Sequence, residues 1–430
     1  MCDNLKCTRP VFLILPPFLI FEYLLIFMQQ PQRKIINDPV YGFITISRQL
    51  IFDIIAHPYY QRLRRIQQMA LANYVYPGAV HTRFHHSVGA YHLMCQAISE
   101  LCNKGIEITE EESEAAKAAI LLHDIGHGPY SHTLENILVP SASHEEIGLL
   151  IMHKMNEDLD GRLSLAIDIF TNRYYKTFLH SLISGQLDMD RMDYLTRDSF
   201  YTGVSEGVIG YDRILKMLIV HNGELMIEEK AIYSAEKFLI ARRQMYWQVY
   251  LHKAVLGAEK MLKKTVERVK EIWKPEDTLL QTGSPLDIFL AADGHTPPDF
   301  IDAFCSIDDS DVMFAIKRWS RHPDKVLSIL SNGLLNRRLL KCTLQNTQVN
   351  SDSVAAARKA VASRLHICEE EAAYLAFSGI AENTTYKMGN EHIDILYKDG
   401  SVREISQVDN PLIHSTLSMP VKKFYFCQLR

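Results

Sequence analysis

The sequence predicts a mostly α-helical protein with a smaller α+β region at its C-terminus, and three observations support this fold class. Apolar side chains recur at helical spacing from residue 34 to about 270. A stretch rich in proline, glycine and polar residues, 274–287, then interrupts that pattern. Beyond it, residues 392–406 alternate around a Lys-Asp-Gly turn as a β-hairpin does, and residues 421–428 are typical of a strand.

Each expected helix has its own signal. Pro58 is suited to a helix start, and the apolar positions that follow it have helical spacing. Gly105 is suited to a C-cap, and Thr109 followed by acidic residues is suited to an N-terminus. Helices are therefore expected over residues 58–70, 86–105, 109–124, 235–273 (one long helix or a helix pair), 307–320 and 351–365.

Composition excludes some classes of function. The chain has 430 residues and a net charge of −5, so no global basic field indicates nucleic acid as the main partner. Its eight cysteines form no CxxC pair, which argues against a zinc ribbon or a disulfide framework and suits a reducing, cytoplasmic location.

Residues 1–33 form an apolar N-terminal extension. The run 11–27 is apolar enough for a membrane segment, but Pro16, Pro17 and Glu22 interrupt it. No small-residue cleavage site follows the run, which argues against a secretory signal. We interpret the extension as the product of an over-early start codon, with membrane anchoring through residues 11–27 as the alternative.

The stretch LLHDIGHGPYSH, residues 121–132, carries the first chemical signal. Imidazole and carboxylate are usual ligands of a divalent metal, and His123 and Asp124 are adjacent on the expected helix. His127 follows His123 by four residues and is expected on the same face. The helix is expected to end at the Gly-His-Gly-Pro sequence, 126–129, which opens backbone space for an anionic substrate. An HD pair alone is also typical of an ordinary helix C-terminus.

Two further clusters favour the metal site. Residues 81–87, HTRFHHS, add histidines beside an arginine. Residues 187–199, LDMDRMDYLTRDS, place four aspartates in an apolar context. Some of these carboxylates should be buried, and buried carboxylates need a cation or hydrogen-bond donors.

Taken together, RFHHS, HDIGHGPYSH, SHEE and DMDRMDY make the chain resemble the HD-domain deoxynucleoside triphosphate triphosphohydrolases. The similar branch includes the animal enzyme with an added SAM domain. The resemblance runs from about Lys34 to Lys253 and implies an HD-domain helical core. It places the metal ligands at His86, His123, Asp124 and Asp190. Two imidazoles and two carboxylates leave positions open on a six-coordinate ion, which favours Mn, Fe or Mg over a structural zinc.

The resemblance also implies the reaction and its residues. Metal-activated water would attack the α-phosphate and release deoxynucleoside and inorganic triphosphate. The implied catalytic histidines are His127, His132 and His144. The implied substrate-binding residues are Gln68, Met69, Arg83, Arg191, Tyr194, Asp198, Arg242 and Tyr250, with the phosphates at the arginines and the sugar at the others.

Regulation and assembly follow from the same resemblance. A regulatory nucleotide would bind near Lys34, Ile35, Gln61 and Arg64, although the family's guanine-reading aspartate is replaced by Ala56. The resemblance implies a homo-oligomer. We divide the chain into an HD phosphohydrolase domain, 34–273, and a C-terminal α+β region, 274–430, with an expected oligomerisation and regulatory role.

Two other functions remain open from sequence. An HD-type phosphatase or phosphodiesterase would act on nucleoside monophosphates or cyclic nucleotides. A nucleotide-sensing or nucleic-acid-binding protein with vestigial chemistry would need neither the intact ligand set nor turnover, and the sequence lacks a concentrated basic stripe.

Overall fold

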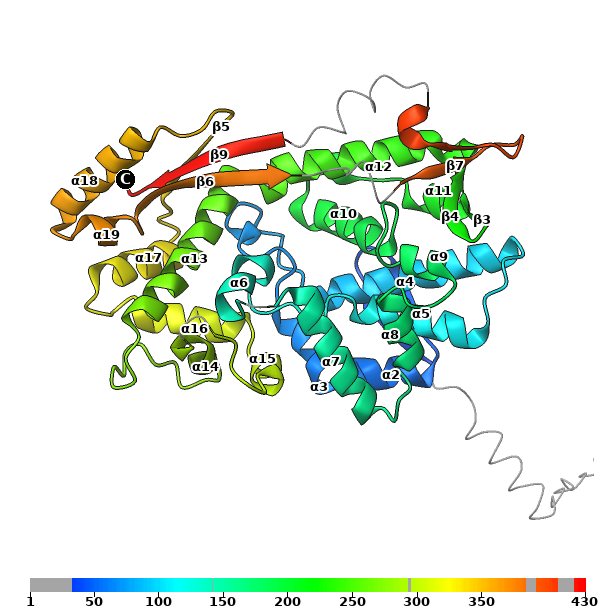
Figure 1. The fold of residues 1–430 in the computed structure, drawn as a ribbon, viewed down its shortest axis with the longest axis horizontal. Coiled ribbons are helices and arrows are strands. Elements are labelled where there is room, and N and C mark those ends of the chain that lie inside the picture. Colours follow the sequence, from blue (N-terminus) through cyan, green and yellow to red (C-terminus); the bar gives the residue numbers. More distant parts are fainter. Residues whose placement is uncertain (1–32, 141, 293–294, 384–391, 409–420) are drawn as a thin grey trace, which may run out of the picture.

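The structure is a computed structural model that describes residues 33–140, 142–292, 295–383, 392–408 and 421–430. The expectations for residues 1–32, including the apolar run, lie outside this part. Figure 1 shows helices packed around α4 and α5, with two small sheets at opposite upper ends of the molecule. The predicted mostly α fold class with small C-terminal sheets is confirmed.

The first part of the chain forms the helical core. A β-hairpin precedes it, and a second hairpin, β3–β4, lies within it. The elements are β1 (Lys34–Asp38), β2 (Gly42–Ile46), α2 (Gln49–Ala56), α3 (Pro58–Gln61), η1 (Arg62–Arg65), η2 (Ala72–Tyr74), α4 (Arg83–Asn103), α5 (Glu110–Leu122), η3 (Ser131–Thr133), α6 (Glu135–Leu138), α7 (His144–Asp158), α8 (Ser164–Phe170), α9 (Thr177–Ser181), α10 (Met189–Thr202), η4 (Ser205–Gly207), α11 (Tyr211–Lys216), β3 (Leu218–His221), β4 (Glu224–Glu228), η5 (Glu229–Ala231), α12 (Ile232–Met245), the π-helical turn η6 (Tyr246–Tyr250) and α13 (Lys253–Ile272).

The C-terminal part adds helices beside α13, extends the sheet of β3 and β4, and forms another sheet of its own. Its elements are α14 (Leu286–Ala291), α15 (Ile301–Ser306), α16 (Asp309–Trp319), α17 (Lys325–Leu335), β5 (Lys341–Gln345), α18 (Ser351–Leu365), α19 (Glu369–Ala372), β6 (Ala376–Asn383), β7 (Asp394–Leu396), β8 (Val402–Glu404), η7 (Ile405–Gln407) and β9 (Val421–Gln428). The sheet orders are β3-β4-β7-β8 and β5-β9-β6. The predicted hairpin (β7–β8), the terminal strand and the break after α13 are confirmed.

Helices α4, α5 and α10 form the centre of the core, and the predicted metal ligands lie on α4, on α10 and in the turn that follows α5. Leu93, Met94 and Ala97 of α4 are fully buried. Thr109 caps α5 through a capping box with Glu112, as the sequence signal predicts. Because α10 packs against α4, and α4 against α5, the three helices hold their polar positions in a fixed relation.

The helix predicted over residues 58–70 is wrong beyond Arg65. Helix α3 ends at Gln61 and η1 at Arg65, after which Gln67 pairs with Thr82 in an isolated bridge. The Arg62 guanidinium is fully buried and donates to the carbonyls of Ile125 and His127, at 2.8 and 2.9 Å. These long-range hydrogen bonds override the local helical spacing.

Helix α5 ends earlier than predicted, at Leu122 rather than at the Gly-His-Gly-Pro sequence. The physical reason is the His123 side chain, whose Nδ1 lies 2.6 Å from the Ile120 carbonyl oxygen. In a continuing helix, that carbonyl would accept from the backbone N–H of Asp124. The two HD-motif side chains therefore project from a turn.

Candidate metal centre and substrate pocket

The four predicted ligands converge at one point. His86 comes from α4, His123 and Asp124 from the turn after α5, and Asp190 from the first turn of α10. His86 Nε2 lies 3.2 Å from His123 Nε2 and 3.1 Å from an Asp190 carboxylate oxygen. Asp124 oxygens lie 3.5 Å from each of the two imidazole nitrogens. The structure thus brings together side chains that are up to 104 residues apart in sequence.

This cluster fits a divalent cation. Neighbouring ligands of an octahedral ion with bonds of about 2.1 Å lie about 3 Å apart, close to the spacing of these donor atoms. Burial lowers the pKa of His86, but the Asp190 and Asp193 carboxylates raise it, to about 10 overall. The carboxylates around His86 therefore favour positive charge at this position, which a bound cation would supply.

The imidazoles of His86 and His123 are each oriented by a contact of their Nδ1 atom. His86 Nδ1 lies 2.7 Å from Asp193, whose carboxylate also accepts two 2.9 Å hydrogen bonds from Arg197. Arg197 in turn donates to Asp38 at 2.7 Å. Because the Nδ1 atoms of His86 and His123 are engaged, each ring points Nε2 at the cluster, as metal-ligating histidines do.

The three predicted catalytic histidines form a second group beside the first. The His127 ring stacks on His144 with centroids 4.1 Å apart, and His132 lies edge-on to both. The expectation that His127 shares a face with His123 is wrong, because the helix has already ended and His127 belongs to this second group. His127 Nε2 still reaches Asp124, at 3.4 Å.

Charge distinguishes these histidines. Burial, followed by the neighbouring Arg83 guanidinium, holds the pKa of His127 well below its usual range, so this ring is neutral. Glu135 lies 2.9 Å from His132 Nδ1 and 2.7 Å from His144 Nδ1. Both rings therefore present Nε2 away from Glu135. His132 is the accessible member, with 68% of its side chain exposed.

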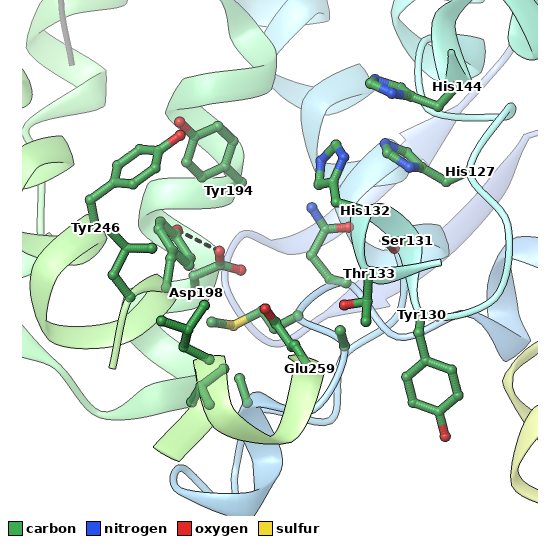
Figure 2. Close-up of a pocket in the computed structure, with 18 of the residues that line it drawn as sticks. His127, Tyr130, Ser131, His132, Thr133, His144, Tyr194, Asp198, Tyr246 and Glu259 are labelled. Carbon is green, nitrogen blue, oxygen red and sulfur yellow. Dashed lines mark hydrogen bonds between the residues drawn. The ribbon is translucent and has the colours of Figure 1, made fainter. Parts of the chain in front are cut away.

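A cavity of about 680 Å³ opens in front of both groups. Asp124 and Asp190 reach it from the metal cluster, together with the three histidines and Arg83. Figure 2 shows His127, His132 and His144 side by side on one wall. All five predicted sugar-binding residues also line this cavity: Gln68, Met69, Tyr194, Asp198 and Tyr250.

Asp198 is fixed by two hydrogen bonds inside this cavity. Tyr250 donates its hydroxyl to one carboxylate oxygen at 2.6 Å (dashed in Figure 2), and His81 Nε2 lies 2.7 Å from the other. Asp198 and His81 are buried, so the carboxylate is held rigidly.

Of the three predicted phosphate-binding arginines, Arg83 lines the cavity, whereas Arg191 and Arg242 contact other parts of the chain. Arg83 hydrogen-bonds to Asp124 and, at 2.8 Å, to Ser131 Oγ, and it lines the cavity. Arg191 instead donates to Asp188 and to the Gly185 carbonyl, and Arg242 donates to Gln186 at 3.2 Å. Neither Arg191 nor Arg242 is among the described residues that line the cavity.

The expected regulatory residues come from β1, α3 and η1. Lys34 and Ile35 belong to β1, and the Lys34 ammonium lies 5.0 Å from the centre of the Phe52 ring. Arg64 donates to Gln61 at 2.9 Å. None of the three described cavities includes these four residues.

Sequence reasoning missed several residues of the site. Asp193 had a signal, since it is three residues from Asp190 and four from Arg197 on the same helix. Glu135 had a weaker one, three residues after His132. Glu259, which lines the cavity from α13, stands in an ordinary amphipathic helix and had no signal.

The fold and the site define a helical hydrolase whose candidate metal ligands come from α4, the turn after α5 and α10. The HD domain family matches residues 83–198, and the HD associated region matches residues 209–288. The chain is 32% identical over 317 residues to the uncharacterized protein YwfO of Bacillus subtilis, covering 72% of each chain. A solved phosphohydrolase structure from Bacteroides thetaiotaomicron is 48% identical, with a TM-score of 0.87 over 93% of this chain and 100% of that one.

The chain belongs to the HD-domain phosphohydrolases, a family of metal-dependent hydrolases. It is also 29% identical over 264 residues to the human deoxynucleoside triphosphate triphosphohydrolase SAMHD1. That match covers 51% of this chain and 42% of the human protein. None of the helices in the described part of the chain has the length and apolar character needed to cross a membrane.

Proposed function

We propose that this phosphohydrolase cleaves deoxynucleoside triphosphates into deoxynucleoside and inorganic triphosphate. The observation that carries the proposal is one cavity that joins Asp124 and Asp190 to the rigid Asp198–Tyr250 pair. The first pair belongs to the candidate metal site and suits phosphate chemistry. The second pair suits a sugar hydroxyl, since a fixed carboxylate accepts a hydrogen bond from it.

The proposed ligands His86, His123, Asp124 and Asp190 would hold Mn, Fe or Mg. When bound, such an ion acidifies a water molecule and neutralises charge on phosphate oxygens. The buried Arg83 guanidinium beside Asp124 adds a fixed positive charge facing the cavity, which suits the oxygens of the α-phosphate.

We assign proton transfer and hydrogen bonding in this reaction to the histidines. A bond forms between water oxygen and the α-phosphorus, the bond to the 5′ oxygen breaks, and that oxygen needs a proton. His132 is accessible, and its Nδ1 lies 2.9 Å from Glu135, so it would donate this proton from Nε2. Neutral His127, whose Nε2 lies 3.4 Å from Asp124, would donate to this carboxylate and hold it beside the attacking water.

The C-terminal region contributes to this site in our proposal. Asp309 of α16 accepts hydrogen bonds from the backbone N–H groups of Gln67 and Tyr130, at 2.8 and 2.7 Å. Gln67 directly precedes Gln68, and Tyr130 is two residues before His132. Ile380 and Ala381 of β6 line the cavity as well. We propose that residues 274–430 complete the active site, in addition to the expected oligomeric and regulatory role.

Product analysis tests the proposed function. The metal-loaded protein is incubated with each dNTP, NTP and dNMP, with and without a second nucleotide, and products are separated by ion exchange. Deoxynucleoside plus inorganic triphosphate is the expected result. Pyrophosphate plus monophosphate, or turnover of monophosphates or cyclic nucleotides alone, contradicts the proposal and favours the other HD-type reaction.

A variant pair tests the site. Asp124→Ala should abolish turnover and metal binding, whereas Asp168→Asn should change neither, because Asp168 forms only a surface pair with Arg173 at 3.1 Å. Circular dichroism checks that both variants fold. Retained turnover in folded Asp124→Ala would mean that the ligand assignment is wrong.

A further inference from the structure

One carboxylate in the substrate cavity, that of Glu259, forms no hydrogen bond or ion pair within the part of the chain that the structure describes. Glu259 projects from α13 into the cavity and is only partly buried. One turn along α13, Lys263 lies 3.9 Å from Glu267 and forms its ion pair with that carboxylate. Because Glu259 is only partly buried and lines the cavity, its carboxylate is available to contact a ligand there.

Glu259 is unsuited to the phosphate end of the substrate, because a carboxylate repels a triphosphate. Its place in the cavity agrees with this. Figure 2 shows Glu259 far from His127 and His144, with Asp198 nearer to it than these histidines are in that view. A nucleotide with its phosphates at the histidines and its sugar at Asp198 would therefore extend its base toward Glu259.

The surroundings of Glu259 suit a base. Lys260 and Lys263 line the cavity from α13 together with Glu259. The apolar side chains of Leu251, Val255 and Leu256 line it from the same stretch of chain, and Ile380 and Ala381 line it from β6. Such apolar side chains pack against the faces of a flat aromatic ring, while a single carboxylate among them can contact only the ring's edge. Edge contacts distinguish bases because each edge carries its own pattern of donors and acceptors.

We infer that Glu259 is a specificity-determining residue that reads the base edge and favours guanine, an inference that rests on the proposed function. An ionised carboxylate is an acceptor only, and its two oxygens match the two adjacent N–H donors of guanine, at N1 and the 2-amino group. Thymine offers one N–H between two carbonyl oxygens, which repel the carboxylate. Adenine and cytosine offer one amino group beside a ring nitrogen that is itself an acceptor.

Protonation of Glu259 tunes this preference. Burial raises the pKa of its carboxyl to about 7, with Lys260 acting in the opposite direction. A protonated carboxyl donates as well as accepts, so it pairs with the amino group and ring nitrogen of adenine or cytosine. The preference for guanine over adenine should therefore increase as the pH rises from about 6 to 8.

The test compares kcat/KM for the four dNTPs on the metal-loaded wild type, Glu259→Gln and Glu267→Gln. Glutamine keeps the size but replaces one acceptor oxygen by a donor, so the ratio of kcat/KM for dGTP over dTTP should fall about tenfold or more. Glu267 lies on the same helix and pairs with Lys264 at 2.8 Å, outside the cavity. Its variant should keep the wild-type ratio.

Two results would overturn the inference: an unchanged ratio in Glu259→Gln, or an equal loss for all four dNTPs, which would place Glu259 against the sugar or the phosphates. Calorimetric binding of deoxyguanosine and thymidine makes the test independent of turnover. If the wild type hydrolyses no dNTP, the proposed function fails, while weaker deoxyguanosine binding by Glu259→Gln still supports base reading. Equal binding by the two proteins then overturns it.

Discussion

At the scale of single residues, the imidazole of His86 depends on a carboxylate that is not itself a predicted ligand. Asp193 is fully buried between His86 and Arg197 and holds the ring in the tautomer that presents Nε2. Asp193→Asn should therefore lower the affinity for Mn²⁺ by about 10- to 100-fold with little change in fold. Competition with a chelating dye measures the affinity.

Asp168→Asn is the matched control for this prediction, since its partner Arg173 lies on the surface. Wild-type affinity in a folded Asp193→Asn protein would contradict the orienting role. Circular dichroism must accompany the measurement, because the substitution also weakens the contact of buried Arg197.

Glu259 gives a second prediction at this scale, on pH and stability. Its carboxyl has a pKa of about 7 in the folded chain, against 4.5 ordinarily. The stability that the protonated form contributes is complete below about pH 4.5 and is lost as the pH rises through 7. Glu259→Gln should therefore match the wild type near pH 5 and be more stable at pH 8.

The raised pKa corresponds to a gain of at most about 3 kcal/mol in the free energy of unfolding of Glu259→Gln. Because the carboxylate faces a solvent-accessible cavity, we expect roughly half of that gain. Urea unfolding of both proteins at several pH values measures it, with Glu267→Gln as the control. Parallel stability profiles for the wild type and Glu259→Gln would contradict the raised pKa.

At the residue scale, the sequence could predict the environment of residues that belong to a recognisable motif. The sequence predicts that some of the four aspartates of residues 187–199 are buried with partners, and Asp188, Asp193 and Asp198 are. The contacts of Arg191 and Arg242 could not be predicted, because they depend on the loop that places Gly185 and Gln186 beside them.

At the scale of elements, the candidate site depends on the close approach of α7 to the turn after α5. A Cβ atom on Gly126 would lie 2.0 Å from the His144 carbonyl oxygen and 2.3 Å from the Gly148 nitrogen, so the backbone must move. Gly126→Ala should cost about 1–3 kcal/mol of stability. It should also lower turnover at least tenfold, since it separates His127 from His144.

Gly148→Ala provides the matched control across the same contact. Its Cβ would meet nothing closer than 3.5 Å, an ordinary contact, and alanine suits a helix better than glycine by about 1 kcal/mol. Chemical denaturation and steady-state kinetics compare the two variants. Equal effects of the two substitutions would show that the contact does not set the positions of the histidines.

For helices, the sequence predicts structure correctly where the stabilising hydrogen bonds are local. Helices with capping signals, such as α5 after Thr109 and α16 after Asp308, follow the sequence because their hydrogen bonds are local. Residues 62–70 do not, because Arg62 and Gln67 hydrogen-bond to residues 63 or more positions away. Spacing alone contains no information about such partners.

At the scale of the whole molecule, the candidate metal site ties together parts of the chain that are distant in sequence. Its residues come from α4, the turn after α5 and α10, whose packing forms the centre of the core. An ion that binds only the folded chain stabilises it by about 2.7 kcal/mol at a concentration 100 times its dissociation constant. Removal of the ion should therefore lower the midpoint of cooperative thermal unfolding, Tm, by several degrees.

Differential scanning calorimetry with and without a chelator measures this effect, and added Mn²⁺ should restore Tm. Asp190→Ala should unfold at a Tm that the chelator does not change, because the variant lacks one of the four converging ligands. Asp168→Asn should respond as the wild type does. If elemental analysis shows that the wild type has lost its metal while Tm is unchanged, the four side chains do not hold a cation that ties these helices together.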